Sequence, residues 1–597
     1  MCIRDSPVAV SSMGYKDTFE STVVANLDFD QKLDFITKGL SFKALISFKN
    51  WSYNSKYRLQ GYNTYQLTDY TKNEDGTYNY TVNSIGDATN HTLDSFFGTD
   101  GDRRFYIQGY FNYDRAFGDH HVGGMLLYNQ DEYNSNVNSS LLNSLPKRRM
   151  GIAVRAAYDY ANRYLFEFNA GYNGSENFAK GHRFGFFPSV SVGWNISQEK
   201  FWEPIRNIVS NFKIRGSYGL VGNDQVPYTR FLYMGITTLN DSPSYQTGYG
   251  SHKESHNGPT FSRFENEDMT WEVGHKLNVG ADIQLFNSLN LTVDAFREIR
   301  SNILTTKGSI PNYLGAAKTV IYGNFAKVKN WGVDLAVDYG KQINRDLSIQ
   351  FKGTFTFARN RVMETDEAAD IRPALSAVGK PLNTLWGYVA DGLYIDEAGI
   401  ANNPTSTLGN ITIAAGDVKY VDQPDVNGNY DGQIDSDDRV AIGHPTIPEI
   451  IYGFGPSITW KKWDFSVFFQ GQANVSLMMS GFEPFGTQSK NNVLEWIAED
   501  YWSKENQNPN AKYPRLTKYN NNNNMQSSTY WLRNAAFLKL KNAEVGYNFK
   551  WGRVYMSGTN LLTFSPFKLW DPEMGGGKGM AYPTQRTFNL GVQITFK

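Results

Sequence analysis

The sequence predicts an all-β protein: a transmembrane antiparallel β-barrel with long extracellular loops. Three observations predict this class: apolar and polar residues alternate, short turns alternate with long loops, and aromatic residues lie beside the short turns. Aromatic residues make up 15% of the 597 residues, which favours strands. The absence of any run of 18 apolar residues excludes an ordinary membrane-spanning helix but not barrel strands, whose hydropathy signal is weak per segment.

The alternation is clearest in the last strand of the chain. Its apolar side chains fall on one face of an extended strand and its polar side chains on the other. The apolar face consists of Phe588, Leu590, Val592, Ile594 and Phe596. Residues 152–160 and 164–172 alternate in the same way on either side of a short turn. We expect these apolar faces to contact lipid.

The connections between strands differ in length in a regular way. Short connections lie near residues 161–163, 286–290, 342–346, 461–462 and 550–553, and long ones near 222–270, 361–448 and 473–530. When a side is assigned to each connection, the short turns fall on one side and the long loops on the other. This predicts about 17 strands, with short periplasmic turns, long extracellular loops and a periplasmic C-terminus.

Aromatic residues beside the short turns suit the membrane interface. They are Tyr158, Tyr160, Tyr164, Trp460, Trp463 and Trp551. A soluble β-sandwich or propeller has little reason to collect them at one end of its strands. Residues 199–211 and 494–502 break the alternation and predict short helical pieces, and the asparagine run at 520–524 predicts a polar loop tip.

Several segments, taken in order, resemble the SusC/RagA family of TonB-dependent outer-membrane transporters. They include FGFFPSVSVGWNIS at 184–197, FKIRGSYGLVGN at 212–223, YWSKENQNPNAKYPRL at 501–516 and WLRNAAFLKLKNAEVGYNF at 531–549. The resemblance implies a 22-stranded barrel that encloses a plug domain. About 17 strands would then be the C-terminal part of that barrel, starting near its sixth strand. We therefore expect an N-terminal truncation without the plug domain, with residues 1–16 as a leader of uncertain origin and 17–597 as the barrel domain.

The resemblance also implies a function. The whole protein would import a nutrient, an oligosaccharide (glycan) or a peptide, across the cell outer membrane. Energy would arrive through TonB, bound by the missing N-terminal part, and a SusD-like lipoprotein would cover the barrel mouth. The formal net charge of −1 gives no indication of nucleic-acid binding. The alternatives are a passive porin, a surface-adhesion barrel and a soluble glycan-binding β-protein.

Catalytic motifs are absent from the sequence, so we expect no enzyme. HExxH, GxSxG and P-loop patterns do not occur, although the site of a barrel hydrolase can come together from separate strands.

One segment, DVNGNYDGQIDSDDR at 425–439, has metal-ligand spacing. Read from Asn427 it resembles an EF-hand loop, whose oxygen ligands suit Ca²⁺. The candidate ligands are Asp425, Asn427, Asn429, Asp431, Gln433 (through its carbonyl), Asp435 and Asp438. The family that the sequence resembles usually has a more compact form of this motif. By that resemblance Asn429 and Tyr430 are a two-residue insertion, which leaves Asp425 or Asn427 as the first ligand. The alternative is a turn whose side chains cap backbone groups without an ion.

Aromatic residues of the long loops are candidate substrate contacts, because aromatic faces stack on sugar rings and peptides. They are Trp386, Tyr388, Tyr394, Trp496, Tyr501 and Trp502. Packing within the loops would use the same residues.

Overall fold

The computed structural model describes residues 11, 13–86, 92–136, 141–226, 230–308, 321–368, 371–481, 493–518 and 520–596. Most of the predicted leader, with Cys2, lies outside these residues. Strand β1 begins at Gly14, which pairs with Leu59. Regular pairing thus starts a few residues before the predicted boundary at residue 17. Within the described part of the chain, no helix has the length and apolar character needed to cross a membrane.

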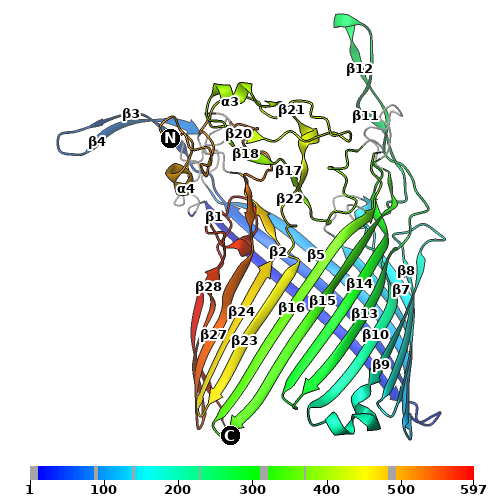
Figure 1. The fold of residues 1–597 in the computed structure, drawn as a ribbon. Helices are drawn as coiled ribbons and strands as arrows, with labels where there is room; N and C mark the ends of the chain where they lie inside the picture. Colours follow the sequence, from blue (N-terminus) through cyan, green and yellow to red (C-terminus); the bar gives the residue numbers. More distant parts are fainter. Residues whose placement is uncertain are drawn as a thin grey trace.

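Seventeen strands form one antiparallel sheet, the barrel wall (Figure 1). Each wall strand pairs with the next wall strand along the chain, which is a simple meander. In order they are β1 (Gly14–Lys32), β2 (Leu40–Leu59), β5 (Asp94–Phe117), β6 (His120–Ser135), β7 (Lys147–Tyr160), β8 (Tyr164–Ser175), β9 (Phe184–Asn195), β10 (Val209–Asn223), β13 (Glu272–Leu285), β14 (Leu289–Thr306), β15 (Tyr322–Asn344), β16 (Leu347–Glu364), β23 (Ile450–Trp460), β24 (Trp463–Ala473), β27 (Phe537–Phe549), β28 (Gly552–Phe564) and β29 (Thr587–Ile594). This confirms the predicted all-β barrel and its strand number.

The two ends of the wall differ as predicted. Short turns join the strands at the lower end in Figure 1, where the C-terminus also lies. One of them has only Lys461 and Lys462 between the paired residues Trp460 and Trp463. The longest connections, which follow β2, β10, β16 and β24, lie at the upper end, and the connection between β9 and β10 is the longest at the lower end. We call these the short-turn end and the long-loop end.

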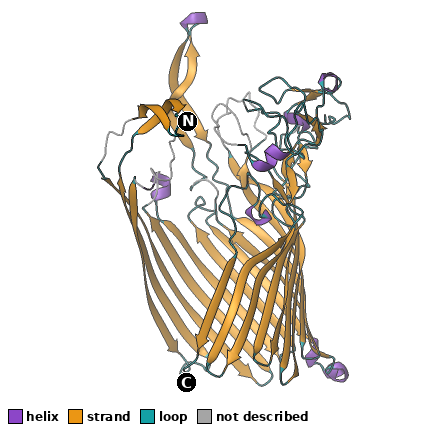
Figure 2. Cartoon of the chain, turned by 90° about the vertical axis from the view of Figure 1, so that its left-hand side faces the viewer, coloured by secondary structure: helices purple, strands orange, loops and turns teal. Residues whose placement is uncertain are grey.

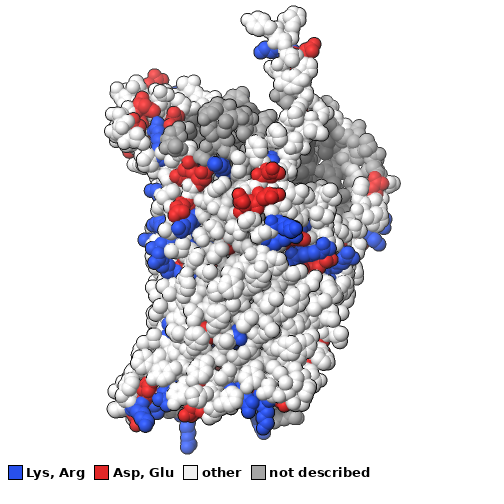
Figure 3. All heavy atoms as spheres, turned by 90° about the vertical axis from the view of Figure 1, so that its right-hand side faces the viewer, with Lys and Arg blue, Asp and Glu red and all other residues white. Residues whose placement is uncertain are grey.

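The outer face of the wall is apolar and the inner face is charged. Leu590 pairs with Met556 and Val592 pairs with Val554, and all four side chains are exposed. On the inner face Arg553 forms ion pairs with Asp464 and Glu544. Figure 3 shows a broad belt with few charges between two charged zones. The predicted lipid-facing side of the last strand is therefore its outward side.

Aromatic residues border this belt at the short-turn end. Five of the six predicted residues are exposed on the surface: Tyr158, Tyr164, Trp460, Trp463 and Trp551. Short helical turns lie at the same end (Figure 2), namely η1 (Ile196–Gln198) and η2 (Lys200–Ile205). They lie within or next to the predicted helical segment 199–211, and their 3₁₀ form keeps the connection compact.

Two hairpins project from the long-loop end (Figure 1). One consists of β3 (Thr64–Lys72) and β4 (Tyr78–Gly86). The other consists of β11 (Ile236–Thr247) and β12 (Glu254–Arg263), with η3 (Gly250–His252) at its tip. The short helix α2 (Leu141–Ser144) lies between β6 and β7.

The connections after β16 and β24 fold together into a lobe, which comprises the described residues of 371–449 and 474–535. Tyr388 N–H donates to Ser527 O and Thr529 N–H donates to Tyr388 O, so the two connections are joined backbone to backbone. The lobe contains β17 (Leu385–Gly387), β18 (Ala390–Leu393), α3 (Glu397–Ala401), β19 (Thr405–Ser406), β20 (Val418–Tyr420), β21 (Gln433–Ile434), η5 (Ser436–Asp438), β22 (Val440–Ile442), β25 (Ser476–Met478), α4 (Glu495–Glu499) and β26 (Leu532–Asn534). Helix α4 confirms the helical piece predicted at 494–502. The connection between β28 and β29, with η6 (Pro572–Met574), packs Phe567 and Trp570 against the lobe.

Two apolar clusters form the interior of the lobe. One surrounds Trp531, Tyr513 and Ile497, and the other surrounds Tyr388, Val418 and Ile434. The lobe is therefore a folded unit with a core of its own, not a set of loose loops.

Candidate functional site

A buried polar network organises the lobe. The Asp417 carboxylate is fully buried and accepts two hydrogen bonds from the Arg515 guanidinium, at 2.7 and 3.0 Å. The side-chain amides of Asn521 and Asn524 also donate to Asp417, each at 2.9 Å. Because each of these groups has its partner, the charge can be buried without a large penalty.

The asparagine run is part of this network. Asn521, Asn523 and Asn524 are at most 2% exposed, so the prediction of a polar loop tip at 520–524 is wrong. The reason is that Asp417 and the backbone around Val418 supply donors and acceptors for their amides. No local signal in the sequence joins residues so far apart in the chain.

Three of the predicted aromatic contacts lie inside the lobe. Tyr388, Tyr394 and Trp502 are 4–7% exposed, and Tyr388 stacks at a tilt against Tyr420 with ring centroids 5.2 Å apart. Burial raises the pKa of both Tyr388 and Tyr394, which keeps their hydroxyls neutral. In this structure these rings are buried in the interior of the lobe, as the packing alternative describes.

The other three aromatic candidates are half-buried. Trp496 packs edge-on against Tyr513, with centroids 6.1 Å apart, and Tyr501 lies against the same cluster. Trp386 lies on β17 next to the buried Gly387. Each of these residues is partly exposed, and a ligand contact by the three stays a prediction.

The predicted metal ligands act as turn caps in this structure. Asp425 Oδ1 accepts the N–H groups of Asn427 and Asn429 at 2.8 and 2.9 Å, and Asp431 accepts the N–H of Gln433 at 2.8 Å. The backbone N–H groups lower the pKa of Asp425. Across the described ranges, no three His, Cys, Asp or Glu side chains converge as metal ligands. These contacts are those of a turn whose side chains cap backbone groups.

Asp438 differs from the other acidic residues of this segment because it is buried. Its two carboxylate oxygens accept the N–H groups of Gln423 and Asp435, both at 2.7 Å. Burial raises the pKa of Asp438, and the nearby carboxylates of Asp422 and Asp435 add to the rise. Several acidic groups therefore lie close together here.

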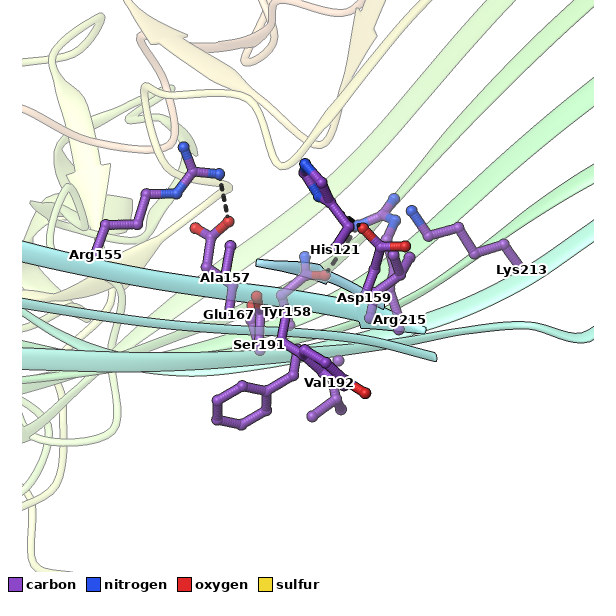
Figure 4. Close-up of a pocket in the computed structure, with 16 residues that line it drawn as sticks. His121, Arg155, Ala157, Tyr158, Asp159, Glu167, Ser191, Val192, Lys213 and Arg215 are labelled. Carbon is purple, nitrogen blue, oxygen red and sulfur yellow. Dashed lines mark hydrogen bonds and ion pairs between the residues drawn. The ribbon is translucent and has the colours of Figure 1, made fainter. Parts of the chain in front are cut away.

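The inner face of the wall forms a second polar site, a hollow of about 510 Å³ lined by residues of β6, β7, β8, β9, β10 and β13. Figure 4 shows the charged side chains of Arg155, Glu167, Asp159 and Arg215 on one side of the sheet, and the side chain of Val192 on the other. Arg155 binds Glu167 at 2.6 Å. Arg215 binds Asp294 at 2.6 Å and Asp282 at 3.2 Å. This face suits a hydrated lumen, whereas the opposite face suits lipid.

The wall is an antiparallel meander with an apolar outer belt, an ion-paired inner face and short turns at one end. Together these features define an outer-membrane β-barrel protein. The family model "TonB dependent receptor-like, beta-barrel" matches residues 9–561. The chain belongs to this family, and the predicted SusC/RagA resemblance is confirmed. The family consists of transporters and receptors, not enzymes.

The similar proteins agree with this assignment. TonB-dependent receptor P3 of Formosa agariphila is 26% identical over 74% of this chain and 45% of its own length. TonB-dependent receptor SusC of Bacteroides thetaiotaomicron is 24% identical over 74% of this chain and 43% of its own length. The RagAB peptide transporter structure has a TM-score of 0.71 at 20% identity, covering 97% of this chain and 62% of that chain. The chain thus spans less than half the length of these curated relatives.

Proposed function

We propose that this chain is the barrel part of a SusC-like importer that takes up an oligosaccharide or a peptide with energy delivered through TonB. The observation that carries the proposal is the wall itself, with its ion-paired lumen below a folded lobe. A passive porin needs no packed lobe of this size at its mouth. The family assignment and the SusC and RagAB likenesses support the same function.

In this proposal the long-loop end is extracellular and the short-turn end, with the C-terminus, is periplasmic. Support comes from the general form of outer-membrane barrels, which have short periplasmic turns and longer extracellular loops. Substrate would then meet the lobe first, where Trp386, Trp496 and Tyr501 are the proposed contacts.

The proposed partners follow from the relatives. A SusD-like lipoprotein would cover the long-loop end, and TonB would bind an N-terminal part of the whole protein. The likeness to the TonB-dependent receptor SusC and to the RagAB peptide transporter supports this arrangement.

Uptake by cells that make the whole protein tests the proposal. Labelled oligosaccharides and labelled peptides are supplied to separate cultures, with and without TonB. We expect one class to accumulate only when TonB is present and the proton gradient is intact. Accumulation that is unchanged without TonB would overturn active import and favour the passive porin.

A further inference from the structure

The acidic segment that connects β20 to β22 has features that turn capping does not explain. Six aspartates and no Lys or Arg occur from Asp422 to Asp438. Asp431, Asp435 and Asp438 have the spacing of positions 5, 9 and 12 of an EF-hand loop. Gly432 then takes position 6, where a sharp turn requires glycine, and its φ is +75°. The later half of the segment therefore fits a cation-binding loop.

The structure places Asp422, and not Asp425 or Asn427, beside the sharp turn at Gly432. Gly432 N–H donates to Asp422 Oδ2 at 2.9 Å, which holds Asp422 beside the sharp turn. Asp425 N–H donates to Asn429 O at 2.9 Å, so residues 425–429 close on themselves. This small turn is pushed out of the loop, since Val426 and Tyr430 on either side of its tip are each 66% exposed.

Asp422 supplies an independent observation. The residue is only 7% exposed, and its Oδ1 atom is buried without a hydrogen-bond partner. In the described part of the chain neither Asp422 nor Asp438 forms an ion pair with Lys, Arg or His. A buried carboxylate oxygen without a partner is costly and calls for a ligand.

We propose that this segment binds one Ca²⁺ ion, with Asp422 as the first ligand and Asp431, Asp435, Asp438 and the Gln433 carbonyl as the others. Asp422 and Asp438 are held in place by their backbone hydrogen bonds. In this structure Asp431 and Asp435 accept the N–H groups of Gln433 and Asp437, each at 2.8 Å. Both side chains would turn away from these backbone groups when the ion binds, which brings them together with Asp422 and Asp438. Asp425 and Asn427 do not take part, because their turn lies outside the loop.

Such an ion would stabilise the lobe. Ile434, between two of the ligands, is 1% exposed and packs in the cluster with Tyr388 and Val418. Strand β21 also pairs with β19. A cation that fixes the loop would therefore fix one side of this cluster. The inference is independent of the proposed transport function.

Titration of the whole protein, purified in detergent and stripped with a chelator, tests the site. Calorimetry with CaCl₂ should show one site, and Tb³⁺ should gain luminescence from the nearby Tyr388. D422N and D438N should each weaken Ca²⁺ binding by more than about 10-fold. The matched control D425N, in the same segment, should bind as the unchanged protein does. Absence of binding, or an equal loss in D425N and D422N, would overturn the proposal.

A second measurement needs no variant that could fail to fold. Protease cleavage of the lobe in the unchanged protein is followed in CaCl₂, in MgCl₂ and with chelator. Slower cleavage in CaCl₂ alone supports the site, whereas equal rates in all three solutions would contradict it.

Discussion

At the scale of single residues, Asp417 determines how the lobe holds together. It is the common acceptor for Arg515, Asn521 and Asn524, which lie 98, 104 and 107 residues further along the chain. Replacing it would leave the two buried amides without this acceptor, and the Arg515 guanidinium, 23% exposed, with the Thr412 carbonyl at 3.4 Å. Loss of these buried hydrogen bonds lowers the free energy of unfolding far more than loss of an exposed ion pair does.

We expect Asp417→Ala to destabilise the lobe by about 3–5 kcal/mol. Protease cleavage within the lobe should then be faster by roughly 100-fold or more, because cleavage follows the population of the open form. Asp391→Ala is the matched control in the same lobe. Asp391 binds Lys419 at 2.6 Å, but its side chain is 66% exposed. We therefore expect this variant to lower the stability of the lobe by at most about 1 kcal/mol. Equal effects of the two variants would contradict the role of Asp417.

Sequence reasoning could identify candidate residues but not their environment. Tyr388 and Trp386 are two residues apart, yet one is buried and the other half-buried. The asparagine run resembles a loop tip in sequence because its partner Asp417 lies 104 residues from Asn521 in the chain. Contacts of this kind leave no local pattern, so polarity alone misled the prediction.

At the scale of elements, the wall strands were predictable because each strand carries its own two-residue period. The final strand shows this, since its predicted apolar face is its outward face. The lobe elements are only two to five residues long, too short for any period, so the sequence could predict α4 but not the strands around it.

The last strand provides a direct test of sidedness. Leu590→Arg would place a charge on the lipid side near mid-depth. It should lower the free energy of unfolding by about 2–4 kcal/mol. Asn589→Arg, one residue earlier and on the inner face beside Ser557, should have little effect. The measurement is the unfolding midpoint of the whole protein in detergent. Unfolding is monitored by the shift of the folded band in gels. A larger effect of Asn589→Arg would reverse the assignment of the two faces.

The connection between β28 and β29 is held by a buried lysine. Lys539 is 1% exposed and its Nζ contacts Asp571 and Glu573, each at 2.6 Å. Burial alone would raise the pKa of both carboxylates, but the Lys539 ammonium outweighs it, and both pKa values are lowered. Carboxylates with a lowered pKa stabilise the fold above their unfolded pKa, near 4.

We therefore expect this connection to loosen as the pH falls below about 4, because protonation of Asp571 and Glu573 removes the ion pairs. Hydrogen exchange of residues 565–586, expressed as protection relative to the chemical exchange rate at each pH, measures the change. In Lys539→Met the protection should be low at every pH. Lys541→Met is the control: Lys541 is 3.3 Å from Glu573 and more exposed, so the fall in protection with falling pH should persist. Protection that does not change with pH in the unchanged protein would refute the clamp.

At the scale of the whole molecule, the wall has two edges. In the described residues β1 pairs only with β2, and β29 pairs only with β28. Unpaired backbone groups in lipid each cost several kcal/mol, which is why membrane barrels are closed. The two edges therefore need partners before the wall is stable in a bilayer.

We expect this chain alone to fail to fold stably in liposomes, and to show no energised uptake there. The whole protein, under the same conditions, should give the gel shift that is typical of a folded barrel. A stable folded band and solute accumulation by the chain alone would contradict both the edge argument and the proposed need for TonB.

The wall and the lobe are built on separate principles: the wall on backbone pairing between neighbours in sequence, the lobe on side-chain packing between distant segments. Substitutions inside the lobe, away from the backbone hydrogen bonds that join Val362 of β16 to Gly379 and Lys380, are therefore weakly coupled to substitutions in the wall. Because of this separation, a lobe from another protein could be grafted onto this wall.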